Sequence, residues 1–362
     1  MNKKQALRLV IFILIFFAVL PPLTYAMRTN GQIKDIFTGF YAEKKDTIDV
    51  ILIGSSPVYP FYSCPEIYAD TGISAYPLSS NVQRPAAALP LVKEALKTQS
   101  PKLFVFEMRM YTMEEGRMTE NAAYTRGVTD NLKYSANRVE LINRLVPMTD
   151  ESGDRYTYWF DIFKYHSNWR SLRLADQWKC IFYEKEHPLK GFELISDVCP
   201  LKDEDIPSVN TEETVPIPAK HEETLRELLE YLKSNDLNAL FIVSPYREKE
   251  EEAAMINYMR PIITSYGYAF EDMNESYDEI GLDFKTDYQD YGGHVNINGA
   301  IKCTKYMEKL LSSYDLPDHR SSEGYASWDS AASLFAAEEA KAEDALNAHI
   351  ANGEFVDIEP TW

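Results

Sequence analysis

The chain has 362 residues, of which 45% are hydrophobic and 13% aromatic, so it has enough apolar material for a packed core and is not a disordered chain. Asp and Glu number 56 against 37 Lys and Arg, which gives a formal net charge of −19. A surface of that charge repels polyanions at long range, and nucleic acid is therefore a poor candidate partner.

The amino terminus has the pattern of a membrane anchor. Three basic residues among the first eight precede an uncharged stretch over 9–27, which begins LVIFILIFFAVL. Basic residues before an apolar run orient it with the amino terminus in the cytoplasm. These cues favour an uncleaved signal anchor over 1–28, in a single-pass protein of the cell membrane whose domain lies outside the cytoplasm. A cleaved signal peptide is the alternative, because 24–26 (Thr-Tyr-Ala) loosely fits a small-residue cleavage site.

After the anchor, 29–46 is predicted to form a short helix or linker. From residue 47 onward, buried strands alternate with helices. The strands are predicted over 47–54, up to Ser79, and over 101–108, and the helices over the first part of 64–78 and over 84–99. This β-α-β-α-β order is typical of a parallel sheet covered by helices on both faces, which is a three-layer α/β/α fold.

An insertion is predicted at about 110–215, because the alternation stops there. Helical patterns at 129–145 and 155–172 are followed by aromatic, Pro-bearing and acidic stretches. We expect this insertion to pack over the ligand end of the sheet, and its aromatic residues predict packing more than a ligand site. The alternation then resumes with a helix over 219–236, a strand over 237–245, a helix over 248–267, a short strand over 268–273 and a final core helix after 292.

The domain is predicted to span 47–318, and 319–362 to form an acidic helical tail. Within the tail, 328–350 is rich in Ala and helix-prone, which favours an accessory helix outside the core. The four cysteines lack Cys-x-x-Cys spacing. An exported location would permit a Cys180–Cys199 disulfide, but the pattern favours buried free thiols. No metal site and no organic cofactor is predicted.

A pair of serines follows the first predicted strand, in the segment VILIGSSPVYP. Ligands of open parallel sheets bind at the carboxyl ends of the strands, so a serine at this turn can place its hydroxyl in a cleft. Ser56 is the candidate nucleophile. The alternative is that Ser55 and Ser56 only cap the next helix, with Pro57 in its first turn.

The far end of the domain contains the base that a serine nucleophile needs. His294 lies in the segment DYQDYGGHVNING, just before the last core helix, with Asp287 and Asp290 upstream. An imidazole titrates near neutrality, and a carboxylate holds it in the correct tautomer. The alternative is a loop whose Asn296 and Asn298 only cap the helix.

Acyl transfer also needs hydrogen-bond donors for the developing oxyanion. The second predicted strand ends in the polar segment PLSSNVQ, which should meet the same cleft. The backbone amide of Ser79 and the side-chain amide of Asn81 are the candidate donors. An ordinary strand-to-helix loop is the alternative interpretation.

Together these segments resemble the SGNH/GDSL hydrolase superfamily over about 47–313, the insertion excepted. Ser56 matches the serine of the first family block, Ser55 stands where Asp is common, and His294 matches the histidine of the last block. The segments GSSPVY, PLSSNVQ, SPY and DYQDYGGHVNINGA are more similar still to a membrane-anchored, extracytoplasmic branch found in Gram-positive bacteria. That branch is similar to D-alanine transfer and alginate acetylation proteins, which work beside membrane-bound O-acyltransferases.

The resemblance implies a serine esterase or O-acyltransferase that acts on acyl esters of a cell-envelope polymer. In that reaction Ser56 attacks the acyl carbon, His294 transfers the proton, Asp290 orients His294, and the backbone at Ser56 and Ser79, with Asn81, stabilises the oxyanion. The implied partners are an acylated envelope polysaccharide or similar ester and a membrane-bound O-acyltransferase.

The sequence departs from the family pattern at several positions. Pro57 stands where relatives often carry His. The family spacing is Asp-x-x-His, whereas Asp290 lies four residues before His294. Gly292 and Gly293 can absorb the extra residue as a bulge; otherwise the chain is a catalytically degraded envelope protein that binds a glycan or a membrane-bound O-acyltransferase. After the third strand no Gly-x-Asn-Asp block follows, and Glu107 and Arg109 predict a structural ion pair. A third interpretation is an anchored α/β domain without chemistry.

Overall fold

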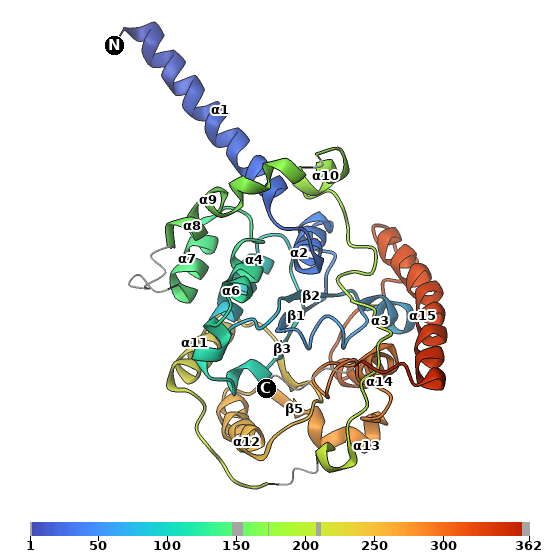
Figure 1. Cartoon of the computed structure of the whole chain (residues 1–362). Helices are drawn as coiled ribbons and strands as arrows, with labels where there is room; N and C mark the ends of the chain where they lie inside the picture. The colour runs from blue at the N-terminus through green and yellow to red at the C-terminus, as the bar shows by residue number, and fades with distance from the viewer. Residues whose placement is uncertain (1, 147–154, 173, 208–210, 357–362) are drawn as a thin grey trace.

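The structure is a computed structural model, and it describes residues 2–146, 155–172, 174–207 and 211–356. Within those ranges the fold is built on one sheet of five parallel strands in the order β2-β1-β3-β4-β5 (Figure 1). The strands are β1 (Val50–Gly54), β2 (Ala75–Ser79), β3 (Leu103–Glu107), β4 (Ala239–Val243) and β5 (Ala269–Asp272). Each lies within a segment predicted as a strand, so the prediction of an α/β protein with a parallel sheet is confirmed.

Alternate residues of each strand face opposite sides of the sheet, and both sides are apolar. Ile51 and Ile53 of β1 belong to one hydrophobic cluster, whereas Val50 and Leu52 belong to another. Strands buried on both faces are continuous in apolar residues, which is why VILIG and LFVFE lack the alternation of a half-exposed strand.

Helices pack on both faces of the sheet. One face is covered by α2 (Gln32–Ala42), α4 (Ala88–Ala95), α11 (Ala219–Ser234) and α12 (Glu250–Ser265). The other face is covered by α3 (Cys64–Thr71), α13 (Tyr277–Ile280), α14 (Ile297–Leu311) and α15 (Ala326–Asn352). In α11 the buried residues Leu225, Leu228, Leu229 and Leu232 follow helical spacing and form the apolar stripe that meets the sheet.

The segment between β3 and α11 consists of short helices and extended chain. Its helices are α5 (Glu115–Thr119), α6 (Ala122–Thr129), α7 (Ala136–Leu145), α8 (Arg155–Trp159), α9 (Ile162–Tyr165) and α10 (Leu174–Ile181). The described chain also contains 3₁₀ helices, of which three lie in this segment: η2 (Arg109–Tyr111), η3 (His166–Ser171) and η4 (Asp203–Asp205). Two lie outside it: η1 (Pro85–Ala87) and η5 (Met273–Ser276). Parts of the predicted insertion, 147–154, 173 and 208–210, lie outside the described residues.

The predicted position of the insertion over the ligand end holds for its extended part and for α6. The amide of Glu193 donates to the carbonyl of Tyr59, and that of Cys199 to Tyr288, so the extended part runs past the loops at the ends of the strands. The helix α6 lies beside the side chain of Ser80, in the loop after β2. The remaining contacts are at the side, with α7 against α4, and α9, η3 and α10 against α1.

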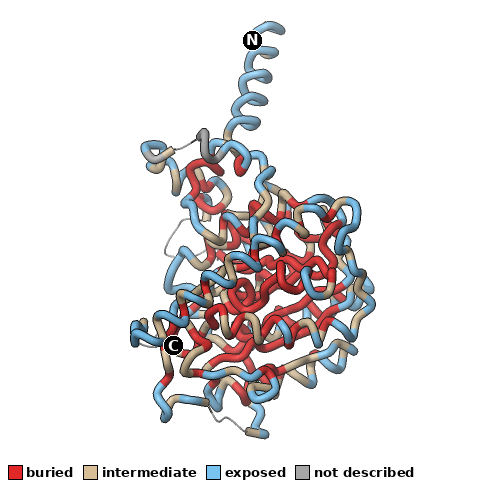
Figure 2. The backbone as a smooth tube through the Cα atoms, turned by 90° about the vertical axis from the view of Figure 1, so that its right-hand side faces the viewer, coloured by how far each residue is buried: buried red, intermediate tan, exposed pale blue. Residues whose placement is uncertain are grey.

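The first helix, α1 (Lys3–Met27), is long and apolar enough to cross a membrane, and no other described helix passes the same test. It projects from the body, and only its last turn is buried (Figures 1 and 2). Thr24, Tyr25 and Ala26, the site of the alternative signal-peptide cleavage, are at most 4% exposed. Tyr25 and Ala26 pack in a small cluster with Cys180 and Ile181.

The carboxyl-terminal helix α15 packs on α3 and α14, so the prediction of an accessory tail is wrong for this part of the chain. Trp328, Phe335 and Leu346 are buried in the hydrophobic clusters. Their wide spacing among alanines hid the apolar stripe in the sequence. Residues 357–362 of the tail lie outside the described part. All four cysteines lie in the described part of the chain and are buried free thiols, as predicted.

Candidate active site

Ser56 lies in a turn directly after β1, and the next helix does not begin there. The helix α3 starts at Cys64, and its N-cap is Ser63, whose hydroxyl accepts a hydrogen bond from the amide of Glu66. The interpretation that Ser55 and Ser56 cap this helix is therefore wrong. Pro57 likewise lies in the turn and not in the first turn of the helix.

The two serines have different environments. Ser55 is fully buried, and its hydroxyl accepts a hydrogen bond from the amide of Gln83 at 3.1 Å and donates to the carbonyl of Ser80 at 3.4 Å. Ser55 thus joins the loop after β1 to the loop after β2. Ser56 is partly exposed, and its hydroxyl faces His294.

Three side chains predicted as a catalytic set lie together in a chain of hydrogen bonds. The Oγ of Ser56 is 2.8 Å from Nε2 of His294, and Nδ1 of the same ring is 2.5 Å from Oδ2 of Asp290. With its proton on Nδ1, the ring accepts the hydroxyl proton of Ser56 at Nε2. This is the arrangement that general-base activation of a serine requires.

The loop that carries His294 accommodates the extra residue. Tyr288 and Val295 form an isolated antiparallel bridge, which closes the loop like a short hairpin. Gly292 adopts a φ of +79°, a left-handed conformation that favours glycine. Asn296 then caps α14 by accepting from the amides of Asn298 and Gly299, so the loop both caps the helix and positions the histidine.

The carboxylate of Asp290 is held by three hydrogen bonds within its own loop. In addition to the contact with the imidazole, Oδ1 accepts hydrogen bonds from the amides of Gly293 at 2.8 Å and His294 at 2.7 Å. Burial raises the pKa of Asp290, but hydrogen bonds and the charge of His294 outweigh it and leave the pKa below its ordinary value. Asp290 is therefore an anion at neutral pH, as the orienting partner of a histidine must be.

Two groups outside the loop that carries His294 donate hydrogen bonds to its backbone carbonyls. The guanidinium of Arg109 donates to the carbonyl of Gly293 at 2.7 Å and lies over the ring of Tyr246, 4.5 Å from its centroid. The backbone amide of Arg247 donates to the carbonyl of Gly292 at 2.7 Å. The sequence assigned Arg109 to an ion pair with Glu107 and gave no signal for its contact with a loop 184 residues away.

Glu107 ends β3 next to the serine turn. Its carboxylate accepts from the amides of Arg109 at 3.2 Å and Ser244 at 3.4 Å, and its second oxygen has no hydrogen-bond partner among the described residues. Burial raises the pKa of Glu107 to about 7, against a smaller lowering by Arg109. A Cβ on Gly54 would lie 2.5 Å from the Cβ of Glu107, so only glycine fits before the two serines.

The two predicted oxyanion residues occupy different positions. Ser79 is the last residue of β2, is fully buried and pairs in register with Gly54. Asn81 is exposed, and its Oδ1 accepts from the hydroxyl of Tyr59, which leaves the amide nitrogen as the group that can donate. Val82 follows with a φ of +46°, a strained conformation for a β-branched residue that fixes the loop beside Asn81.

A cavity of 590 Å³ opens beside Tyr59 and Asn81. Its wall includes the chain from Arg28 to Lys34 at the base of α1 and one side of α6 along its length. The cavity therefore connects the loop that bears Asn81 with the place where the apolar helix leaves the body. The sequence did not indicate this cavity, because its walls come from segments distant in the chain.

Comparison of the chain with protein-family models and with curated proteins finds no match. The site therefore rests on its own geometry.

Proposed function

We propose that the protein is a membrane-anchored serine esterase or O-acyltransferase of the SGNH type, whose domain lies outside the cytoplasm. The observation that carries this proposal is the hydrogen-bonded chain of Asp290, His294 and Ser56. The strand order β2-β1-β3-β4-β5 supports it, because the chain places β2 on one side of β1 and β3 on the other. Ligands of such sheets bind at this switch point between β1 and β3, and Ser56 directly follows β1.

In the acylation step, Oγ of Ser56 attacks the carbonyl carbon of an ester while Nε2 of His294 takes the hydroxyl proton. The oxyanion that forms accepts hydrogen bonds from the side-chain amide of Asn81 and from the backbone at Ser56. When the tetrahedral intermediate collapses, the carbon–oxygen bond to the alcohol breaks, and His294 returns the proton to the leaving alkoxide. Asp290 stays ionised and stabilises the imidazolium in between.

In the second step, a water molecule or the hydroxyl of an acceptor attacks the acyl-Ser56 ester. His294 removes its proton, and the Ser56 oxygen leaves and regains a proton from the same ring. Water gives hydrolysis, and an acceptor hydroxyl gives acyl transfer. The chemistry of both steps is supplied by the chain's own side chains.

The substrate that fits this arrangement is an acyl ester on a cell-envelope polymer near the membrane. The cavity beside Asn81 reaches the base of α1, so an ester presented from the bilayer surface would approach the loop that bears Asn81 from that side. The proposed partners are an acylated envelope polysaccharide and a membrane-bound O-acyltransferase that exchanges the acyl group with it.

The test uses the full chain in lipid nanodiscs and a fluorescent fluorophosphonate, which labels an activated serine. Wild-type protein should be labelled, and Ser56→Ala and His294→Ala should lose labelling. Asp290→Asn should slow labelling about 10²- to 10⁴-fold, because the ring loses its anionic partner.

Ser55→Ala is the matched control, since its hydroxyl is the immediate neighbour and should not be the labelled group. Unchanged labelling of Ser56→Ala would remove Ser56 as nucleophile. A folded wild-type protein that takes no label but binds an envelope glycan would replace the enzyme with the binding function.

A further inference from the structure

Among the described residues outside α1, six of the eleven exposed large apolar side chains lie in one segment, 156–182. They are aromatic and 48% to 61% exposed: Tyr156, Phe160, Phe163, Trp169, Trp178 and Phe182. We call these six residues the aromatic collar. Single exposed apolar residues are ordinary, but a contiguous set marks an interaction surface.

The aromatic collar borders the base of the apolar helix. It lies on α8, α9, η3 and α10 and on the residues that directly follow α8 and α10, and three of these elements, α9, η3 and α10, contact α1. Figure 1 shows α9 and α10 on either side of α1 where it leaves the body. The uncharged part of α1, residues 9–27, is about 28 Å long, which is close to the hydrocarbon thickness of a bilayer. The collar therefore lies where that helix would leave the membrane.

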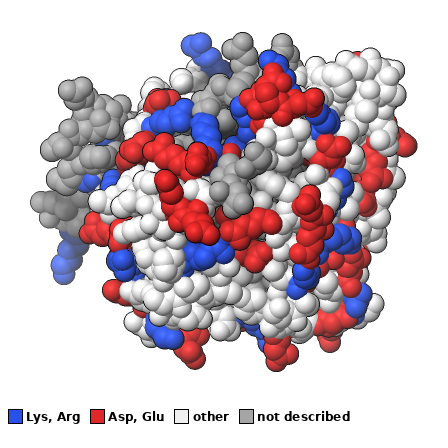
Figure 3. Space-filling view, turned by 90° about the horizontal axis from the view of Figure 1, so that it is seen from below, with Lys and Arg blue, Asp and Glu red and all other residues white. Residues whose placement is uncertain are grey.

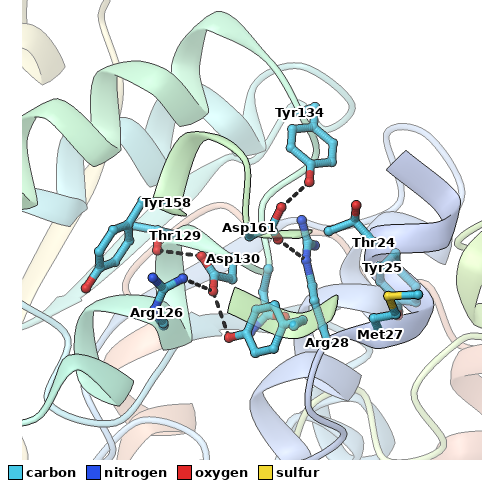
Figure 4. A network of polar contacts seen from close by, with 12 residues as sticks. Thr24, Tyr25, Met27, Arg28, Arg126, Thr129, Asp130, Tyr134, Tyr158 and Asp161 are labelled. Atoms are coloured by element: carbon cyan, nitrogen blue, oxygen red, sulfur yellow. Dashed lines mark hydrogen bonds and ion pairs between the residues drawn. The ribbon is translucent and has the colours of Figure 1, made fainter. Parts of the chain in front are cut away.

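The base of α1 is joined rigidly to the domain. Nε of Arg28 lies 2.6 Å from Oδ2 of Asp161, and both side chains are at most 3% exposed (Figure 4). The hydroxyl of Tyr134 also donates to Asp161. In α2, the ammonium of Lys34 donates to the carbonyls of Tyr25 and Arg28, and burial together with the charge of Arg28 lowers its pKa to about 8. The domain therefore cannot swing freely about the helix.

The exposed charged side chains also differ between the side of the protein that bears α1 and the opposite side. Lys164, Arg170 and Lys179 are exposed among the collar residues. On the face opposite α1, acidic side chains are spread over the surface with Lys and Arg between them (Figure 3), and α12 begins with three consecutive glutamates. Anionic lipid headgroups attract the first set and repel the second.

We propose that the aromatic collar is a membrane-contact surface, and that it lies in the headgroup region of an anionic phospholipid bilayer on the side from which α1 emerges. Amphipathic aromatic rings are enriched at this depth because they bury apolar area and still reach polar groups. Docking at the collar and the rigid base of α1 together fix the orientation of the domain, with the cavity beside Asn81 at the membrane side. The inference does not depend on catalysis.

Tryptophan fluorescence tests this directly, because α1 contains no tryptophan. The full chain is placed, one copy per nanodisc, in phosphatidylcholine with phosphatidylglycerol, part of it brominated near the headgroup end of the acyl chains. Bromine quenches only tryptophans at that depth. Wild-type emission should be quenched, and the double variant Trp169→Phe and Trp178→Phe should lose most of the quenchable emission.

Trp328→Phe is the matched control, because Trp328, on α15, is buried and should contribute no quenchable emission. Equal quenching in the double variant and the wild type would overturn the proposal, as would an unquenched wild type. If the collar is unquenched in single-copy discs and cross-links two copies in crowded ones, it is a protein contact and the lipid assignment is wrong.

Discussion

The guanidinium of Arg109 donates a 2.7 Å hydrogen bond to the carbonyl oxygen of Gly293, the residue next to His294. The contact joins the end of β3 to the loop that carries the histidine. It fixes the height of that loop over the sheet, and with it the 2.8 Å separation between the imidazole and the Ser56 hydroxyl.

Replacing the side chain of Arg109 should therefore slow the reaction of Ser56. Arg109→Met leaves the carbonyl of Gly293 unpaired, and the loop relaxes by a fraction of an ångström, so fluorophosphonate labelling should slow about 10- to 100-fold. Arg109→Lys should recover part of the rate. The exposed Arg226, changed to Met, is the control for loss of a cation. A labelling rate unchanged by Arg109→Met would show that the loop holds its position without this contact.

Burial of Glu107 predicts a pH dependence of stability. Its pKa is about 7 in the folded chain against an ordinary value of 4.5. As pH rises from 4.5 to 7, the unfolded chain releases a proton that the folded chain keeps, so folding stability falls by about 3 kcal/mol in this window.

Glu107→Gln should remove that loss, and its unfolding temperature in detergent should exceed that of the wild type at pH values above 7 but not below 4.5. Glu275→Gln, at an exposed carboxylate, should keep the wild-type pH profile. Parallel profiles for Glu107→Gln and wild type would mean that Glu107 is ionised inside the fold.

The close approach of Gly54 to Glu107 predicts a specific steric effect. A methyl group at position 54 would lie 2.5 Å from the Cβ of Glu107 and 2.7 Å from Cγ2 of Val58, so Gly54→Ala should cost about 1–3 kcal/mol and displace the turn that bears Ser56. Gly116→Ala, where the new methyl meets nothing within 4 Å, should be neutral or stabilising. Thermal unfolding and labelling rates measure both effects, and a fully stable, active Gly54→Ala would contradict the packing.

The ion pair at the base of α1 should be among the costly ones to break. Asp161→Asn leaves Arg28 buried without its counter-charge, and we expect a loss of about 3–5 kcal/mol. The exposed pair of Arg144 and Glu227 has the same 2.6 Å separation, yet Glu227→Gln should cost no more than about 1 kcal/mol because water screens it. Similar unfolding temperatures for the two variants would show that Arg28 finds another partner or reaches solvent.

Much of the fold could be predicted because strands buried on both faces leave continuous apolar runs that are visible in the sequence. The site was predictable for a related reason. Parallel strands bring their carboxyl ends to one edge, so Ser56 after β1 and His294 before the last helix had to lie near each other. The fit of Asp290 could not be decided from spacing alone, because it depends on the φ of Gly292.

Features that depend on contacts between distant segments were not predictable. The predicted partner of Arg109 was Glu107, two residues away, whereas its guanidinium donates to the carbonyl of Gly293, 184 residues away. Ala-rich α15 was expected to stay outside the core, because a few large residues at wide spacing carry its packing. The aromatic residues of α8 to α10 were assigned to packing, and nothing in their pattern reveals that the side chains of the collar face outward.

The buried ion pair of Arg28 and Asp161 couples the rotation of α1 to the rotation of the rest of the protein. A helix joined through a flexible linker would only limit how far the domain can travel, but a helix clamped at its last turn transmits its own rotation. Turning α1 about its long axis therefore turns the mouth of the cavity around that axis by the same angle. In the proposed membrane-anchored state, a membrane protein that binds one side of α1 would therefore set the direction in which Ser56 faces.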